Sequence, residues 1–142
     1  MEIKNRKAYF DYFIEKEYDA GIVLSGTEIK SIRKGSANLK DSYAKVKNGE
    51  VFLLNMFIAK YEDGSYNNKD ERRTRKLLFN KSEINRLGEF VNKEGYTLIP
   101  LELYFKNRRA KVKIGVAKGK HNYDKRESIK KKELERESRK LL

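Results

Sequence analysis

In residues 101–106 and 110–116 every second side chain is apolar. This period of two is typical of a β-strand that buries one face, because successive side chains point to opposite sides of a sheet. We therefore expect two strands here, with Lys111 and Lys113 on the face turned away from the core. Pro100 has no N–H to donate, so its strand should lie at a sheet edge or contain a bulge there.

Three segments of the N-terminal half predict further strands. Residues 8–14 are dense in aromatic side chains, which favour strands, and residues 21–24 form a second short apolar run. Asn48-Gly49 is the strongest local signal, since both residues tolerate the positive φ of a two-residue type I′ hairpin turn. Beyond this turn alternate residues are again apolar and should share one face, namely Phe52, Leu54, Met56 and Ile58.

Two helices are predicted by their first turns. Ser25 and Asn80 each stand three residues before a glutamate, Glu28 or Glu83, at the spacing of a capping box. In this motif each of the two side chains satisfies a free backbone N–H. Apolar residues at helical spacing follow both caps, and glycines are expected to end the two helices. These are Ile29, Ile32 and Gly35 in the first helix, and Ile84, Leu87, Val91 and Gly95 in the second.

Apolar residues almost vanish between positions 61 and 76, where basic side chains cluster instead. Loops of this length are usually functional or disordered, and we interpret the segment as a long, basic, mobile loop. Six or so short strands and two helices then predict a mainly β fold, a small and mostly antiparallel barrel. Closing a sheet in this way removes its exposed edges.

The composition changes after Ala117. Residues 118–142 contain ten Lys and Arg against five Asp and Glu, a net charge of +5. Asp124 and Glu127 have capping-box spacing, but no apolar stripe follows that could dock on a core. We expect a folded domain over residues 1–118 and a basic tail over 119–142, disordered alone and helical when bound.

The charge balance narrows the possible partners. The chain carries 34 Lys and Arg against 21 Asp and Glu, a formal net charge of +13. A nucleic acid or an anionic membrane would attract such a surface. No apolar run approaches the roughly 20 residues that span a bilayer, and the first residues lack the apolar stretch of a secretion signal. We expect a cytoplasmic protein that binds nucleic acid rather than a membrane.

Few patterns in the chain suggest catalysis. There are no cysteines and only one histidine, His121, so thiolate and multi-histidine metal sites are excluded, although a carboxylate-bound Mg²⁺ is not. The glycines of residues 115–120 lack the spacing of a phosphate-binding P-loop. Glu28 and Glu83 are better explained by capping than by acid–base work. Tyr123, among charged residues, is either a stacking side chain or a solvated tail tyrosine.

Several stretches, in register along the chain, together form a recognisable pattern. They are Asn5-Arg6-Lys7-Ala8, Asp11-Tyr12-Phe13-Ile14-Glu15, Ala20-Gly21, Gly26-Thr27-Glu28-Ile29-Lys30-Ser31, Asp41-Ser42-Tyr43, Arg75-Lys76-Leu77-Leu78, Gly115-Val116-Ala117-Lys118-Gly119-Lys120 and Tyr123-Asp124-Lys125-Arg126. With these stretches, from Asn5 into the tail, the chain resembles the small protein B family, whose members bind transfer-messenger RNA.

This resemblance implies a fold and a function. The fold is an oligonucleotide-binding-type closed antiparallel β-barrel with two or three flanking helices and a flexible basic C-terminal tail. The barrel would hold the tRNA-like part of transfer-messenger RNA and travel, with elongation factor Tu and GTP, to ribosomes with an empty A site. The tail would occupy the decoding centre and the vacant mRNA channel, so that translation switches to the tag frame. We expect a monomer that catalyses no covalent step, with no cofactor and no metal.

The resemblance also implies site residues. Positions that match family RNA contacts are Asp19, Leu78 and Asn80, and Asp19 is a departure because glutamate is usual there. The family often has His and Pro where Lys69 and Glu71 stand, which predicts a more flexible basic loop. The tail residues that match the decoding segment are Gly119, Lys120, Tyr123, Asp124, Lys125 and Arg126. The further cations expected on RNA are Arg75, Lys76, Lys111, Lys113 and Lys118.

Two other interpretations of the sequence remain. A ribosomal protein or another translation factor could use a similar barrel to hold ribosomal RNA, which would explain the charge and the strands but not residues 115–126. A Mg²⁺-dependent nuclease would need acidic ligands clustered on one face, which no spacing in the chain marks. The RNA that co-purifies separates the first alternative, and RNA cleavage with and without Mg²⁺ separates the second.

Overall fold

The computed structural model describes residues 2–61, 68–93 and 95–120 of the 142-residue chain. These residues form nine strands and three helices. In chain order they are β1 (Glu2–Lys4), α1 (Arg6–Asp11), β2 (Tyr12–Ile22), α2 (Gly26–Arg33), β3 (Ala37–Asn38), β4 (Tyr43–Lys47), β5 (Glu50–Leu54), β6 (Phe57–Ile58), β7 (Arg75–Leu78), α3 (Lys81–Val91), β8 (Tyr96–Lys106) and β9 (Arg109–Gly119).

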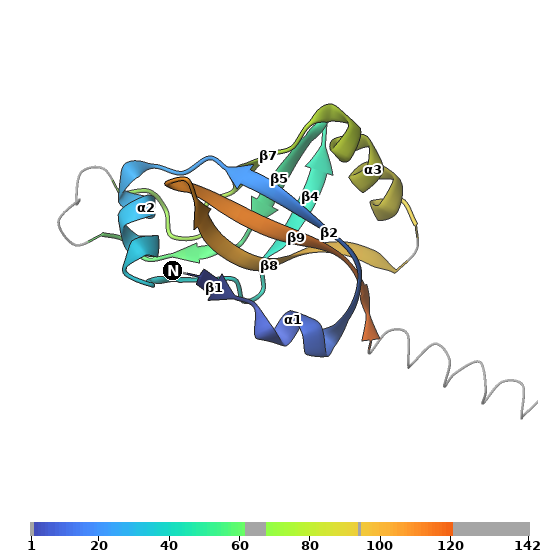
Figure 1. Cartoon of the computed structure of the whole chain (residues 1–142), viewed down its shortest axis with the longest axis horizontal. Coiled ribbons are helices and arrows are strands. Elements are labelled where there is room, and N and C mark those ends of the chain that lie inside the picture. Colours follow the sequence, from blue (N-terminus) through green and yellow to red (C-terminus); the bar gives the residue numbers. More distant parts are fainter. Residues whose placement is uncertain (1, 62–67, 94, 121–142) are drawn as a thin grey trace, which may run out of the picture.

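The strand pairings run in a ring (Figure 1). The order is β8, β4, β5, β7, β2, β9 and back to β8, and β1 is a further partner of β8. Every pairing in the ring is antiparallel. The ring is thinnest between β4 and β8, where Ala44 opposite Leu98 is the one register pair. The mainly β, antiparallel architecture with flanking helices is therefore confirmed.

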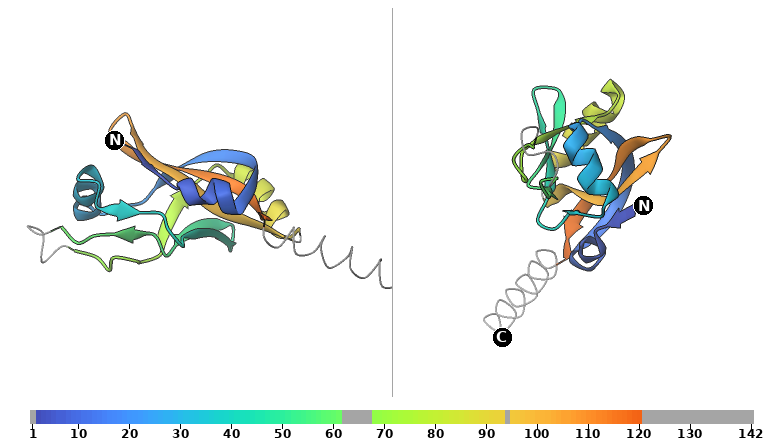
Figure 2. Two further views of the ribbon diagram at one scale, coloured as in Figure 1. Left: turned by 90° about the horizontal axis from the view of Figure 1, so that it is seen from below. Right: turned by 90° about the vertical axis from the view of Figure 1, so that its left-hand side faces the viewer.

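The core fills the inside of this ring. Its side chains come from several strands and from α3, and those with no exposed surface include Leu53, Leu87, Leu98, Val112 and Ile114. Burial of each such side chain is worth about 1.5–3 kcal/mol relative to leaving it in water. Helices α2 and α3 lie at opposite ends of the ring, and α1 lies beside the end of β9 (Figures 1 and 2).

Several local predictions are confirmed. Both capping boxes are present, with reciprocal hydrogen bonds between each N-cap residue and its glutamate. Asn48 and Gly49 have φ of 53° and 73° and join β4 to β5 in a two-residue turn. The alternation in β8 and β9 buries the expected face, and the register shifts between Pro100 and Glu102, which is the bulge predicted at the proline.

The predicted strand over residues 8–14 is wrong in its first half. Residues up to Asp11 belong to α1, and β2 starts only at Tyr12 and runs on to Ile22. The helix buries Ala8 in a small cluster with Ile99, Leu101 and Ala117, while its aromatic Phe10 is 78% exposed. Tertiary packing of one alanine has overridden the strand preference of the aromatic residues.

The prediction that Phe52, Leu54, Met56 and Ile58 share one face is wrong. Val51 and Leu53 are the buried residues of β5, whereas Phe52 and Leu54 lie on its outer face. Asn55 has a φ of 65°, and the bend there changes the phase, so that Met56 is buried. One residue with positive φ is enough to shift a period-two pattern from one face to the other.

The long basic loop is shorter than predicted, because Arg75 and Lys76 lie in β7. Gly95 does not end the preceding helix, which stops at Val91 with Asn92 as C-cap; Gly95 instead has a φ of 87° in the turn before β8. The predicted tail from His121 onward lies outside the described residues, so its boundary and its helix stay predictions.

Gly115 has a packing role within β9. A methyl group added there would lie 2.8 Å from Leu101 Cδ1 and 3.2 Å from Ile14 Cγ2. Only glycine allows β9 to approach these two side chains so closely. The glycine is therefore explained by close packing in the strand rather than by a phosphate-cradling loop.

Candidate nucleic-acid interface

The predicted residues of the folded domain gather on the outer face of β2 and its two neighbours. In the β2–β9 ladder Asp19 stands opposite Lys113, and Gly21 stands opposite Lys111. On the other side of β2, Gly21 is opposite Leu78 of β7. Residues opposite one another in a ladder share a face. Four of the residues proposed from the sequence are therefore brought together by strand pairing alone.

Asp19 is held by a tyrosine from β8. The Tyr104 hydroxyl donates to Asp19 Oδ1 at 2.7 Å, reaching across β9 between Lys111 and Lys113. Burial and the Asp19 carboxylate raise the pKa of Tyr104 to about 12, so the hydroxyl keeps its proton at neutral pH. The exposed carboxylate of Asp19 thus has a fixed position on the surface. The alternation in residues 101–106 puts Tyr104 on the face turned away from the core, but no sequence pattern indicated its partner.

This part of the surface is less basic than the lysine pattern predicted. Lys113 Nζ lies 3.9 Å from Glu102 Oε2 and 4.0 Å from Glu17 Oε2, and Asp19 stands opposite it. Carboxylates therefore surround this lysine on neighbouring positions. A phosphate would meet a mixed field here, whereas a hydrogen-bond donor such as a ribose hydroxyl or a base amine would suit Asp19.

A hollow of about 290 Å³ opens beside Gly21. Leu78, 53% exposed, forms one wall, and Arg108, Arg109 and Lys111 supply cations. Arg108 lies in the β8–β9 turn, where it and Asn107 both have positive φ, and Arg109 is the first residue of β9. Sequence reasoning missed them, although consecutive arginines after an asparagine were a usable turn signal. The hollow combines an apolar wall with guanidinium groups, which suits a nucleotide.

Asn80 caps α3 two residues after Leu78. Its Oδ1 accepts hydrogen bonds from the Glu83 N–H at 2.9 Å and from the Ser82 hydroxyl at 2.8 Å. Its amide nitrogen makes no hydrogen bond to any residue that the structure describes, and the side chain is exposed. Capping therefore uses the oxygen of this amide and leaves both of its N–H donors available for a ligand.

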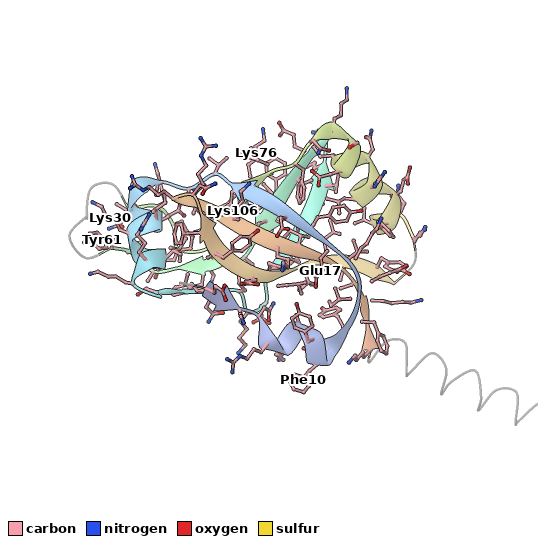
Figure 3. All side chains as sticks on the ribbon, viewed as in Figure 1. Phe10, Glu17, Lys30, Tyr61, Lys76 and Lys106 are labelled. Carbon is pink, nitrogen blue, oxygen red and sulfur yellow. The ribbon has the colours of Figure 1, made fainter. Side chains whose placement is uncertain are left out.

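Arg75 and Lys76 are neighbours in β7 but point in opposite directions. Arg75 has no exposed surface: its Nε donates to Glu28 Oε2 and one of its terminal nitrogens to the Met56 carbonyl, both at 2.6 Å. We therefore no longer count Arg75 among the proposed RNA contacts, because its N–H donors bind groups inside the protein. Lys76 is exposed, with Nζ 3.0 Å from Glu50 Oε1 (Figure 3).

The residues that lead into the tail lie at the opposite end of the same ladder. Gly119 stands opposite Tyr12, nine residues of β2 away from Gly21. At roughly 3.3 Å per residue the two ends are about 30 Å apart. Lys120 donates to the Tyr9 carbonyl at 3.1 Å, and Lys118 Nζ lies 5.5 Å from the Tyr96 ring. The other tail residues proposed from the sequence, Tyr123, Asp124, Lys125 and Arg126, lie outside the described residues.

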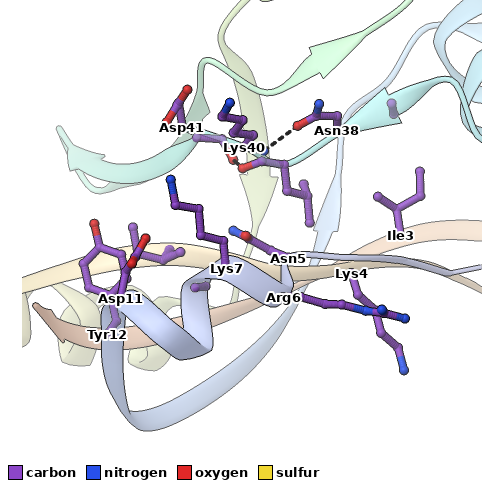
Figure 4. Close-up of a pocket in the computed structure, with 15 residues that line it drawn as sticks. Ile3, Lys4, Asn5, Arg6, Lys7, Asp11, Tyr12, Asn38, Lys40 and Asp41 are labelled. Carbon is purple, nitrogen blue, oxygen red and sulfur yellow. Dashed lines mark hydrogen bonds between the residues drawn. The ribbon is translucent and has the colours of Figure 1, made fainter. Parts of the chain in front are cut away.

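A second hollow, of about 380 Å³, separates α1 from the connection between β3 and β4 (Figure 4). Three of the stretches that carry the family resemblance, those beginning at Asn5, Asp11 and Asp41, meet at it. Four cations and two carboxylates line it: Lys4, Arg6, Lys7, Lys40, Asp11 and Asp41. Sequence reasoning noted the three stretches but did not predict that they converge.

The described residues contain no group of three or more His, Asp or Glu side chains placed to hold a metal ion. Nor does any helix within those ranges combine the length and the apolar character needed to cross a membrane. What the described surface offers is a set of fixed hydrogen-bonding groups, apolar walls and cations.

Comparison with known proteins points to one family. The model of the SmpB protein family matches residues 2–142. The SsrA-binding proteins of Geobacillus kaustophilus (strain HTA426) and Clostridium novyi (strain NT) are each 60% identical over 134 residues, 94% of this chain and 86% or 85% of theirs. A chain in the solved structure "tmRNA-SmpB: a journey to the center of the bacterial ribosome" is 49% identical, with a TM-score of 0.72 and 84% of each chain covered.

Proposed function

The chain belongs to the SmpB protein family, and we propose that it binds the tRNA-like domain of transfer-messenger RNA and delivers this RNA to stalled ribosomes. The observation that carries the proposal is that strand pairing brings Asp19 and Leu78 onto one face, beside Arg108, Arg109 and Lys111. Asp19 and Leu78 are far apart in the sequence and both are exposed, and Asn80 follows Leu78 by two residues.

Each group on this face has a complementary group on RNA. The Asp19 carboxylate, fixed by Tyr104, can accept a hydrogen bond from a ribose 2′-hydroxyl or a base amine. The amide N–H groups of Asn80 can donate to a base or phosphate oxygen. Leu78 gives an unstacked base an apolar surface, while Arg108 and Arg109 hold phosphates. The folded domain would therefore recognise RNA by shape and by unpaired nucleotides.

The tail completes the proposed function at the other end of the molecule. Residues 119–142, with Gly119, Lys120, Tyr123, Asp124, Lys125 and Arg126, would occupy the decoding centre and the vacant mRNA channel of the small subunit. The separation of about 30 Å along β2, obtained from strand geometry, lets one chain hold RNA at one end and reach the ribosome from the other. The protein acts as a monomer in the cytoplasm, with elongation factor Tu and GTP, and catalyses no covalent step.

Substitution of Asp19 tests the binding face. Asp19→Ala should weaken binding of a transfer-messenger RNA transcript with little change in melting temperature, because Asp19 is exposed. Glu89→Ala is a matched control, since it removes an exposed carboxylate from α3 away from both hollows. Equal RNA affinity of the Asp19 variant and the wild-type protein would remove Asp19 from the proposed interface.

Truncation tests whether RNA binding by the folded domain is separate from the function of the tail. A chain that ends at Lys120 retains the whole strand ring and should bind the RNA within a few-fold of the full-length protein. The same truncation should abolish tagging of stalled products in a reconstituted translation system. If the truncated protein tagged normally, the role proposed for the tail would be wrong. Sequencing the RNA that co-purifies with the full chain separates this function from binding of ribosomal RNA alone.

A further inference from the structure

The outer face of β4, β5 and β7 presents an aromatic ring between lysines. Phe52 of β5 stands opposite Lys45 of β4 on one side and opposite Lys76 of β7 on the other. Phe52 is half-buried and both lysines are exposed. The three strands lie side by side in the ring (Figure 1). Because Phe52 points away from the core, packing of the fold does not account for its aromatic side chain.

A hollow of about 450 Å³ opens over this row. Its lining residues share the outer face of the hairpin and of the chain leading into β7: Lys45, Lys47, Asn48, Glu50, Phe52, Leu54 and Thr74. Glu50 is the one carboxylate of the lining, and it is paired with Lys76 at 3.0 Å on the open surface. Such an exposed pair is weak and exchanges readily, so the balance of charge over the hollow favours an anion.

The exposed row beside this hollow continues along β7 toward the surface that we propose binds RNA. Leu78 lies two residues after Lys76 and therefore on the same face of β7. From Leu78 the surface passes to Gly21 of β2, and Asn80 follows Leu78 by two residues in the chain. A nucleic-acid strand that contacts Leu78 can thus extend over β7 onto β5 without leaving the sheet.

We propose that Phe52 stacks on an unpaired base of the transfer-messenger RNA, while Lys45, Lys47 and Lys76 hold its phosphates. The proposal rests on the RNA-binding function above and extends the interface by two strands. A sheet surface that interleaves an aromatic ring with lysines suits single-stranded nucleic acid, because every base has a face that can stack and every nucleotide a phosphate. The charge complementarity and the continuity with Leu78 identify the same RNA as the occupant.

The chain contains no tryptophan, which allows a direct test of stacking. Phe52→Trp places a sole tryptophan in the hollow, and its fluorescence should be strongly quenched when a transfer-messenger RNA transcript is added. Phe57→Trp is the matched control, because Phe57 is also half-buried but lies on the separate β3–β6 sheet under Arg72. Equal quenching at the two positions, or none at position 52 while the RNA is bound, would overturn the proposal.

Affinity and salt dependence provide a second test. Phe52→Leu keeps an apolar side chain but removes the ring, and should weaken RNA binding about fivefold or more. Lys45→Gln combined with Lys47→Gln should lower the slope of log affinity against log salt by about one for each phosphate that is no longer neutralised. Lys30→Gln with Lys34→Gln makes the same charge change in α2 and at its C-cap, where both lysines lie over Tyr61. This pair should leave the slope nearer to that of the wild-type protein; Lys30 and Tyr61 are labelled in Figure 3.

The outcomes separate this inference from the proposed function. If Asp19→Ala loses RNA affinity while Phe52→Leu and the Lys45 and Lys47 double variant do not, the stacking site is wrong and the RNA-binding function stands. If the wild-type protein fails to bind the transcript, the function itself is wrong. A defect of the Phe52 variant confined to ribosome binding, with normal affinity for the free RNA, would also overturn the choice of occupant.

Discussion

Helices α2 and α3 begin with the same local motif and put it to different uses. Ser25 and Glu28 cap the first, and Asn80 and Glu83 cap the second, each pair with reciprocal hydrogen bonds. Glu28 is only 4% exposed and binds two arginines, whereas Glu83 is half-buried and has no ion pair with any residue that the structure describes. The capping glutamate of α2 is thus a buried anchor for two arginines, whereas the capping glutamate of α3 lies at the surface.

The buried anchor also positions β7, the strand that we propose contacts the RNA. Glu28 Oε2 accepts hydrogen bonds from Arg73 and Arg75, and Arg75 in turn donates to the carbonyls of Met56 and Glu71. This network ties α2 to the chain on both sides of residues 62–67 and fixes the start of β7. β7 carries Lys76 and Leu78. The hydrogen bonds of Glu28 with Arg73 and Arg75 therefore hold in place the strand whose outer face we propose binds RNA.

The largest expected effect is that of removing the anchor. Glu28→Ala leaves two arginines without their carboxylate, one of them fully buried, and breaking a buried ion pair in this way costs about 3–5 kcal/mol. The free energy of unfolding in urea measures the loss. Glu28→Gln is the sharper variant, because glutamine can keep the capping box but loses the charge and the second oxygen, which accepts from Arg73 and Arg75. Wild-type stability of the glutamine variant would show that capping alone explains Glu28.

The ion pairs of Glu28 should also make the free energy of unfolding depend on pH, with a smaller effect than the substitution to alanine. Burial alone would raise the pKa of Glu28, but hydrogen bonds from Arg73, the Ser25 N–H and Arg75 outweigh it and hold the pKa below its usual range. The unfolded chain then takes up this proton at higher pH than the folded protein. The contribution of the ionised Glu28 to the free energy of unfolding is complete above the ordinary glutamate pKa. It is lost as the pH falls through the lowered pKa of the folded protein.

Unfolding measurements between neutral pH and about pH 3 test this, with the Glu28→Gln protein as the control. The wild-type protein should lose more stability than the glutamine variant in the acidic part of the range. Parallel curves for the two proteins would contradict the assignment of this proton to Glu28.

At the other helix, capping and binding should separate. Asn80→Ala removes both functions of the amide and should cost about 0.5–2 kcal/mol of stability together with RNA affinity. Asn80→Asp keeps an oxygen for the Glu83 N–H but replaces the amide N–H donors by a negative charge. It should melt close to the wild-type protein and bind the transcript more weakly. If the aspartate variant bound RNA normally, Asn80 would be a cap only.

The two helices also illustrate what the sequence could and could not predict. Each capping box lies within four consecutive residues, so its spacing is visible in the chain and both boxes were predicted. The Glu28–Arg75 contact joins residues 47 positions apart, and the Asp19–Tyr104 contact joins residues 85 positions apart. No local pattern encodes such pairs, because they exist only once the strands are in register. The burial of Arg75 was therefore missed, because the sequence predicted a basic loop as far as residue 76.

The errors in the predicted helices and strands have a similar cause. Residues 8–11 carry aromatic side chains that favour a strand, but packing of Ala8 between β8 and β9 decides for a helix. In β5 the apolar run from Val51 to Leu54 fits either phase of a strand, and the bend at Asn55 determines which face is buried. Because of this error, Phe52 was not recognised from the sequence as a surface residue. The face of a strand is reliable from sequence only where its other face is clearly polar, as in β9.

The smallest expected effect is also the control for the whole comparison. Glu83→Gln makes the same chemical change, at the same position of the same motif, as Glu28→Gln. Glutamine can still accept the hydrogen bond from the Asn80 N–H, and no ion pair among the described residues is broken, so stability should change by less than about 0.5 kcal/mol. RNA affinity should be unchanged or slightly higher, since a negative charge beside Asn80 is removed. The difference between the two glutamine variants in urea therefore measures what burial and pairing add to a capping glutamate. Equal losses for both would mean that the arginines around Glu28 contribute nothing beyond the cap, and that β7 is held in place by its strand partners alone.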